Sequence, residues 1–277
     1  MKRDQKPSRP FEITFTFLIG IILGTMCCGC GTMRSGRAWG ENAIYPVQWK
    51  RIPQAAKDAA LDPITWLPLV GAGVIAVGDW DHNISDWATE HTPIFGSKSG
   101  AEDYSDVARD VLLAEGFATA LLTPSGNEAG EWFWNKARGV AVGAGAVALT
   151  DFATSELKDA FDRERPNGND GSMPSGHSSS AFAGMALANR NLDYIEMNRY
   201  TRTGLKTANI ALATSVAWAR VEGEKHFPTD VLVGAALGNF TTRFIYDAFI
   251  GTEPDDRFSF HVEPSLSGGK LFLSWSF

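Results

Sequence analysis

The residues with the clearest potential for chemistry fall within one stretch of the chain and comprise three cations, two histidines and one carboxylate. If the fold brings them together, the cations can bind a phosphate while one histidine acts as a nucleophile and the other as an acid. Single Lys and Arg residues usually belong to solvated helix faces, but that interpretation does not explain three cations at fixed spacings from the histidines, Pro and Gly residues of this stretch. The candidates, in chain order, are Lys158, Arg165, Ser175, Gly176, His177, Arg220, His226 and Asp230.

His226 and Asp230 are four positions apart, which is about one turn of a helix. At that spacing the carboxylate of Asp230 can bind one ring nitrogen of His226 and leave the other as a bare lone pair. An imidazole held in this way acts as a nucleophile instead of a proton carrier. Such a pair is usually only a surface pair, but Arg220, six positions before His226, favours a site.

The tetrapeptide at 174–177 stands directly before a small-residue segment of helical length at 178–188. A phosphate at a helix N-terminus meets free backbone N–H groups and the positive end of the helix dipole. Gly176 would permit a close backbone approach, and Ser175 would add a hydroxyl donor. Taken alone, the tetrapeptide is equally compatible with an ordinary turn and N-cap.

Three sequence patterns follow one another in this stretch, and they read K-x6-RP, PSGH and R-x5-H-x3-D. Together they resemble the three motifs of the type 2 phosphatidic acid phosphatase / vanadium haloperoxidase superfamily. Ala219 stands where the third motif of that family usually has Ser, so one neutral donor to the phosphate is missing. The resemblance is specific over residues 158–230 and only general over the flanking helices.

The resemblance implies a role for each matching position. His226 would attack phosphorus and form a phosphohistidine, oriented by Asp230. His177 would be the general acid that protonates the leaving alkoxide. The phosphoryl oxygens would be held by Lys158, Arg165, Ser175, Gly176 and Arg220.

The expected function is therefore a metal-independent phosphatase, of the histidine-nucleophile acid phosphatase type, that hydrolyses phosphate monoesters or pyrophosphates, with lipid phosphates as the expected class. Fixed cations stabilise the phosphoryl oxygens, so neither a cofactor nor a metal is expected. The HExxH and P-loop patterns of metal or nucleotide enzymes are absent from the sequence. Two alternatives stay open: a haloperoxidase that holds vanadate in the same pocket, and a non-catalytic envelope lipoprotein.

The charge balance and the cysteine positions exclude several other classes. The formal net charge is −7, which makes a general nucleic-acid binder an unsuitable interpretation. Cys27, Cys28 and Cys30 lie in one short run. The folded domain therefore has no cysteines for a disulfide framework or a cysteine zinc site.

Residues 1–30 have the pattern of a secretory leader, with basic residues before an apolar run at 11–26. The run is shorter than the roughly 20 residues that a spanning helix prefers. Gly29, Cys30 and Gly31 resemble the cleavage point of a bacterial lipoprotein, which makes Cys30 the lipidation candidate. Cys27 departs from the Leu usual in that signal, and an uncleaved anchor helix is the alternative. Either route places the domain in the cell envelope, exported and held at a membrane surface, on the periplasmic face or as an outer-membrane lipoprotein.

The rest of the chain predicts an all-α helical bundle followed by a small β-hairpin. A linker at 31–62 runs into a first helix near 53–61, a helical phosphatase domain spans 63–252, and the C-terminal hairpin occupies 253–277. Charged residues interrupt the apolar segments and mean hydropathy is slightly negative, which favours a water-soluble bundle tethered to the membrane. The apolar segments of helical length lie at 64–77, 107–122, 136–149, 178–188, 205–220 and 229–250.

Two further features invite a functional interpretation. Asp79, Asp81, Asn83 and Glu90 fit four positions of a calcium-binding EF-hand loop, but Ile84 stands where the loop needs Gly. A helix is the better prediction for that stretch. The aromatic cluster at 131–134 suits a protein core or, alternatively, the boundary between membrane and water, and a core position is the more frequent of the two.

Overall fold

The computed structural model describes residues 29–33, 36–41, 43, 49 and 51–251, together with the backbone of two strands. All but the last two residues of the predicted leader lie outside the described residues. The elements are α2 (Arg51–Leu61), α3 (Pro63–Val77), α4 (Asp81–His91), α5 (Lys98–Leu122), α6 (Ala129–Phe161), α7 (Gly176–Leu192), α8 (Arg199–Glu222), α9 (Pro228–Phe249), β1 (Phe258–Glu263) and β2 (Lys270–Trp275).

The helices confirm the predicted all-α bundle, and several are longer than the apolar segments that revealed them. α5 begins nine residues before the predicted start at 107, where the Ser97 side chain accepts a hydrogen bond from the Gly100 N–H at 3.0 Å. α6 continues twelve residues beyond the predicted end at 149. Apolar periodicity marks only the buried part of a helix, whereas caps and mixed polar sequence extend it.

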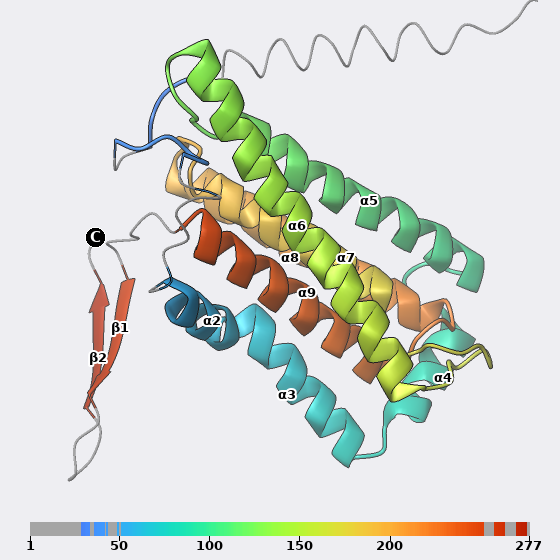
Figure 1. The fold of residues 1–277 in the computed structure, drawn as a ribbon. Coiled ribbons are helices and arrows are strands. Elements are labelled where there is room, and N and C mark those ends of the chain that lie inside the picture. The colour runs from blue at the N-terminus through green and yellow to red at the C-terminus, as the bar shows by residue number, and fades with distance from the viewer. Residues whose placement is uncertain are drawn as a thin grey trace, which may run out of the picture.

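α7 lies at the centre of the bundle and packs against α5, α6, α8 and α9. Figure 1 shows α6 passing over α7 and α8, with α9 between this group and α3. Small residues make the close packing possible. A Cβ added to Gly234 of α9 would lie 2.6 Å from the carbonyl oxygen of Ser175, and one added to Gly184 of α7 would lie 2.8 Å from that of Leu112. Side chains at these positions would therefore push the helices apart.

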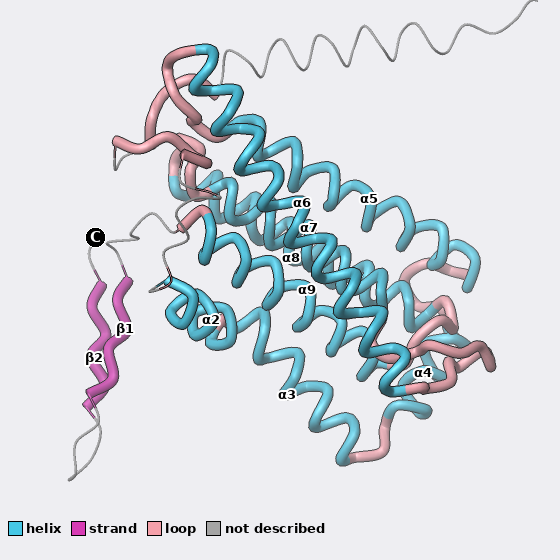
Figure 2. The backbone as a smooth tube through the Cα atoms, in the orientation of Figure 1, coloured by secondary structure: helices cyan, strands magenta, loops and turns pink. Residues whose placement is uncertain are grey.

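This packing gathers the termini of several helices at one end of the bundle. α6 and α8 end there, α7 and α9 begin there, and the N-terminal half of α5 lies beside them. Figure 2 shows the loop between α6 and α7 at the same end as α4. The positive ends of the α7 and α9 dipoles thus face the region that contains the predicted site residues.

The surface carries more large apolar side chains than a water-soluble bundle is expected to have. α6 is long and apolar enough to cross a membrane, and only 28% of its apolar window is buried. α2 and α3, which are bent by 50° at their junction, are together also long and apolar enough to cross a membrane. Phe133 and Trp134 are 56% and 61% exposed, so the core position expected for this aromatic cluster is wrong for both side chains.

The remaining two predictions about local structure hold. α4 covers the stretch with EF-hand-like spacing, so that stretch is a helix. β1 and β2 pair antiparallel, with Phe258 opposite Trp275 and Glu263 opposite Lys270, within the segment predicted to form a hairpin.

Candidate active site

His226 and Asp230 lie close together at the N-terminal end of α9. His226 lies in the loop between α8 and α9 and is 2% exposed, while Asp230 is in the first turn of α9 and is fully buried. Nδ1 of His226 lies 3.8 Å from Oδ2 of Asp230, close enough for charge attraction but longer than a hydrogen bond. Nδ1 has no hydrogen-bond partner among the described residues. The ring therefore directs one nitrogen at Asp230 and keeps Nε2 for another partner.

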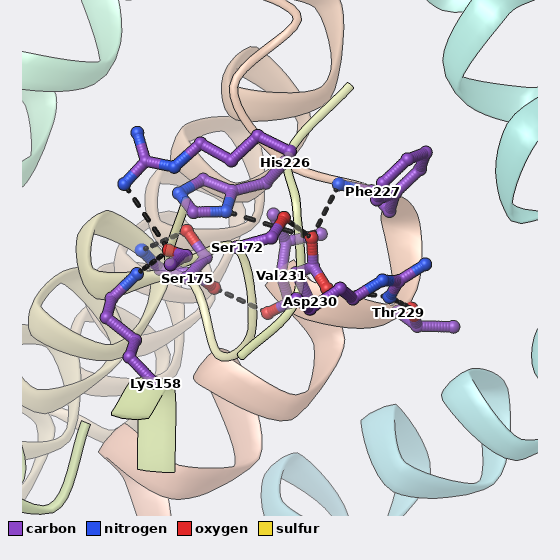
Figure 3. Close-up of polar contacts among 12 residues, drawn as sticks. Lys158, Ser172, Ser175, His226, Phe227, Thr229, Asp230 and Val231 are labelled. Carbon is purple, nitrogen blue, oxygen red and sulfur yellow. Dashed lines mark hydrogen bonds and ion pairs between the residues drawn. The ribbon is translucent and has the colours of Figure 1, made fainter. Parts of the chain in front are cut away.

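Asp230 is fixed by donors on both carboxylate oxygens. Oδ2 accepts hydrogen bonds from the Ser172 hydroxyl at 2.5 Å and the Phe227 N–H at 2.8 Å. Figure 3 shows these contacts on Asp230 beside the imidazole of His226. Burial acts to raise the pKa of Asp230, but His226 and the hydrogen bond from Ser172 outweigh it and hold the pKa below its usual value. Asp230 is thus a fixed negative charge next to His226.

Arg163 holds the other oxygen of Asp230 and is a site residue that the sequence analysis missed. Its Nη1 donates to Oδ1 of Asp230 at 2.8 Å, and its Nη2 donates to Oδ2 of Asp81 at 2.9 Å. The guanidinium also lies 4.4 Å from the centre of the Phe227 ring. Asp81 in turn accepts a hydrogen bond from the Thr229 N–H at 3.0 Å. Asp81, an EF-hand-like position in the sequence, therefore ties α4 to the start of α9.

Two of the predicted cations converge on a single carbonyl oxygen. Lys158, at the end of α6, and Arg165, in the following loop, donate to the oxygen of Gly171 at 2.5 Å and 3.3 Å. The Nε of Arg165 is buried without a hydrogen-bond partner among the described residues. Burial, followed by the charge of Arg165, lowers the pKa of Lys158 to about 8. Two cations at one neutral acceptor form a site that an anion would stabilise.

Ser175 and Gly176 begin α7 next to these cations. Ser175 is the N-cap residue, and its own N–H donates to the carbonyl oxygen of Asp230 at 3.0 Å. Gly176, as the first residue of the helix, presents an N–H without a partner inside the helix. A Cβ added to Gly176 would lie 4.0 Å from Cε of Lys158, so the backbone of Gly176 lies next to the Lys158 side chain. Figure 3 shows Lys158 and Ser175 together beside the His226 ring.

Arg220 brings the third predicted cation from the end of α8. It is 4% exposed, and its Nη1 donates to the Ser105 hydroxyl of α5 at 2.9 Å. Burial lowers its pKa to about 10, so the side chain stays charged at neutral pH. Its Nε is buried without a hydrogen-bond partner among the described residues. The guanidinium thus retains donor capacity for an anion.

His177, in the first turn of α7, contacts two residues of α5 that the sequence analysis also missed. Nε2 of His177 lies 2.5 Å from Oδ1 of Asp106 and 2.8 Å from Nη1 of Arg109. Burial, followed by the positive charge of Arg220, lowers the pKa of His177 to about 4. Asp106 precedes His177 by 71 positions, so no sequence spacing connects them.

A cavity of about 610 Å³ lies on the far side of the Arg163 network, between α3, α4 and α9. Asp81, Arg163 and Thr229 form part of its wall, and aliphatic side chains of α3, such as Ile75, form another part. None of the eight predicted site residues lines it. The cavity therefore adjoins the site through Arg163 and is separate from the cations that would bind phosphate.

Comparisons with known proteins give one family and one solved structure. The model of the PAP2 superfamily matches residues 140–251, which include every predicted site residue. No curated protein matches the chain. A transmembrane PAP2-type phosphatidylglycerolphosphate phosphatase from Bacillus subtilis has a similar structure, at 20% sequence identity and a TM-score of 0.48, over 66% of this chain and 92% of that one. The family match agrees with the resemblance expected from the motifs: residues 140–251 match the model of the PAP2 superfamily.

Proposed function

We propose that the protein is a phosphatase that hydrolyses phosphate monoesters or pyrophosphates, with lipid phosphates as its substrates, through a phosphohistidine on His226. The observation that carries the proposal is the position of His226 against Asp230 beside a group of buried and half-buried cations. The PAP2 match over the same residues supports it.

In the first step, Nε2 of His226 attacks phosphorus while the ester P–O bond breaks. The Nε2–P bond forms as the leaving alkoxide takes a proton from His177. In the second step a water molecule attacks phosphorus, the P–N bond breaks, and His177 takes the proton released by that water. Phosphate leaves and both histidines return to their starting states. Asp230 stabilises the positive charge on the His226 ring in the phosphohistidine.

The cations can stabilise the negative charge that develops on the phosphoryl group during its transfer. Negative charge spreads over the three equatorial phosphoryl oxygens, and guanidinium groups match such oxygens with paired donors. The candidate donors, in chain order, are Lys158, Arg165, Ser175, Gly176 and Arg220. Without a ligand, the same positive field disfavours a proton on His177. A bound phosphate dianion adds negative charge, so we expect it to favour the protonated, acidic form of His177.

Membrane association and a lipid substrate fit the surface of the bundle. Among the described residues, the most exposed large apolar side chain is Val77, at 91%, at the end of α3, and Trp80 near it is 49% exposed. Both precede α4, which contacts the start of α9 and so places them at the site end of the bundle. A phosphorylated lipid held at a bilayer would meet the site from such a surface. Lipidation of Cys30, an exposed residue, stays a prediction.

Activity is expected to need no metal ion and to be inhibited by vanadate. The pocket neutralises the phosphoryl group with fixed cations, and vanadate adopts the five-coordinate geometry of the transferring phosphorus. Arg220→Ala should weaken inhibition by vanadate more than inhibition by phosphate, because only vanadate loads the equatorial oxygens as the transition state does. The measurement is hydrolysis of a lipid phosphate after exhaustive EDTA treatment, with and without vanadate. Loss of activity with EDTA, restoration by magnesium or zinc, and indifference to vanadate would contradict the mechanism.

The pH dependence of phosphohistidine formation should report the buried state of His226. Burial lowers the pKa of His226 to about 4, and the charge of Asp230 opposes that effect. The neutral ring is the nucleophile, so its reactivity is present above about pH 4 and is lost as the pH falls through that value. We expect an acid limb near pH 4 in the rate of phosphoenzyme formation from aryl phosphates, whose leaving groups need no proton.

Ionisation of the substrate adds a second limb to the pH–rate profile, and the pH of that limb changes when the aryl group is changed. The limb that belongs to His226 should keep its position across such a series. A fixed acid limb near the ordinary histidine value of about 6.5 would show that the ring is not desolvated in the working enzyme.

A further inference from the structure

A pair of charged residues on α5 contacts the ring of His177. Asp106 and Arg109 are three positions apart, and their facing atoms, Oδ1 and Nη1, are 4.0 Å from each other. Both approach the same ring nitrogen, Nε2, at 2.5 Å and 2.8 Å. Both precede residues 140–251, so they lie outside the segment that matches the PAP2 superfamily.

These two contacts require different protonation of the ring. A proton on Nε2 makes this nitrogen a donor, and its partner is then the Asp106 carboxylate. A lone pair on Nε2 makes it an acceptor, and its partner is then the Arg109 guanidinium. Because a neutral imidazole carries one proton, the choice between Asp106 and Arg109 also decides whether Nδ1 of His177 is a base or a donor.

We propose that Asp106 is a positioning residue for His177: it accepts the Nε2 proton and so leaves Nδ1 to give a proton to the leaving group and to take one from water. The inference rests on the proposed function, since it assigns the acid and base of that reaction to one ring atom. Through both steps the Nε2 proton stays on the ring and bound to Asp106. Only the Nδ1 proton moves, first to the alkoxide oxygen and then back from the attacking water.

The surroundings of His177 keep Asp106 suited to this role. The hydrogen bond to His177 is the main cause that lowers the pKa of Asp106, so the carboxylate stays ionised at neutral pH. The charged groups that face the ring are Asp106 and Arg109 from α5 and Arg220 from α8. Both cations disfavour a proton on the ring, and Asp106 opposes them. Asp106 is also half exposed, so its replacement leaves no buried cavity.

The tautomer of His177 tests the proposal without any activity measurement. ¹⁵N NMR of the full chain labelled on its five histidines distinguishes a proton on Nε2 from one on Nδ1, and His177→Gln assigns the signal. At pH 7 we expect the Nε2–H form in the wild type and in Arg109→Gln. Asp106→Ala should convert the ring to the Nδ1–H form, because Arg109 is then the remaining partner of Nε2. Asp103→Ala, an exposed carboxylate on the same helix, is the matched control and should change nothing.

Kinetics provide the second measurement. Asp106→Ala should lower kcat roughly tenfold on an alkyl phosphate, a part of the total contribution of a general acid, and much less on an aryl phosphate. In a His177→Ala background the same replacement should have no further effect. An Nε2–H ring in Asp106→Ala, or an equal loss with and without His177, would overturn the proposal. If the chain hydrolyses none of these substrates, the proposed function fails, while the tautomer still decides whether Asp106 positions His177.

Discussion

Replacement of His226 by alanine is expected to abolish turnover, with a loss on the order of 10⁵-fold or more. In the proposed mechanism Nε2 of His226 forms the bond to phosphorus, and among the described residues no other imidazole lies next to Asp230. His177 is bound through its own Nε2 to α5, and in the proposed mechanism it serves the leaving group. A water molecule cannot take the place of His226 easily, because the ring occupies a site that is 2% exposed.

Two measurements check this prediction. Steady-state hydrolysis of an alkyl phosphate gives the loss in rate, and rapid acid-free quenching with labelled substrate shows whether a phosphoenzyme forms. His91→Ala is a suitable control, since His91 is an exposed residue at the end of α4 that stacks only on Trp87. A phosphohistidine that persists in His226→Ala would assign the nucleophile to another residue.

The helical fold and the core of the site were predictable because they depend on short-range patterns. Apolar segments of helical length predict helices, and the short spacing between His226 and Asp230 keeps the two side chains close, with Asp230 in the first turn of α9 and His226 in the loop just before it. The first turns of α5 and the outer turns of α6 were missed because a cap and mixed polar sequence hold them. Periodicity carries no information on such turns.

The residues that complete the site depend on contacts between distant segments. Arg163 stands between Lys158 and Arg165, at a position that the first motif leaves unspecified, and its function emerges only because Asp81 and Asp230 meet around it. Asp106 reaches His177 because α5 packs against α7. The sequence of one chain does not reveal that Asp81 and Asp230 meet around Arg163, nor that α5 packs against α7.

The surface shows a different limit of sequence reasoning. Charged residues within apolar segments favour a water-soluble bundle, yet Phe133 and Trp134 are exposed. Each helix has both a buried face and an outward face, and in α6 the small residues, such as Gly139 and Gly143, take the buried one. Large apolar residues are thereby left outside. Composition alone does not tell whether the small or the large apolar residues of a helix take its buried face.

Replacement of His177 by alanine is expected to cost roughly 10²–10⁴-fold on an alkyl phosphate and far less on an activated aryl phosphate. An alkoxide is a poor leaving group and needs a proton as the P–O bond breaks, which in the proposed mechanism comes from His177. An aryl oxide leaves without one. The two rates are measured on the same preparation, so the aryl phosphate serves as a control for folding and for phosphate binding.

The same variant should also change which step limits the reaction. With an aryl phosphate, His226 is still phosphorylated, but the second step lacks the base that takes the proton from water. The phosphoenzyme should therefore accumulate, and a burst of aryl alcohol should precede slow turnover. An equal loss on alkyl and aryl substrates, without a burst, would remove His177 from the acid role and would place the leaving-group proton on another residue of the site.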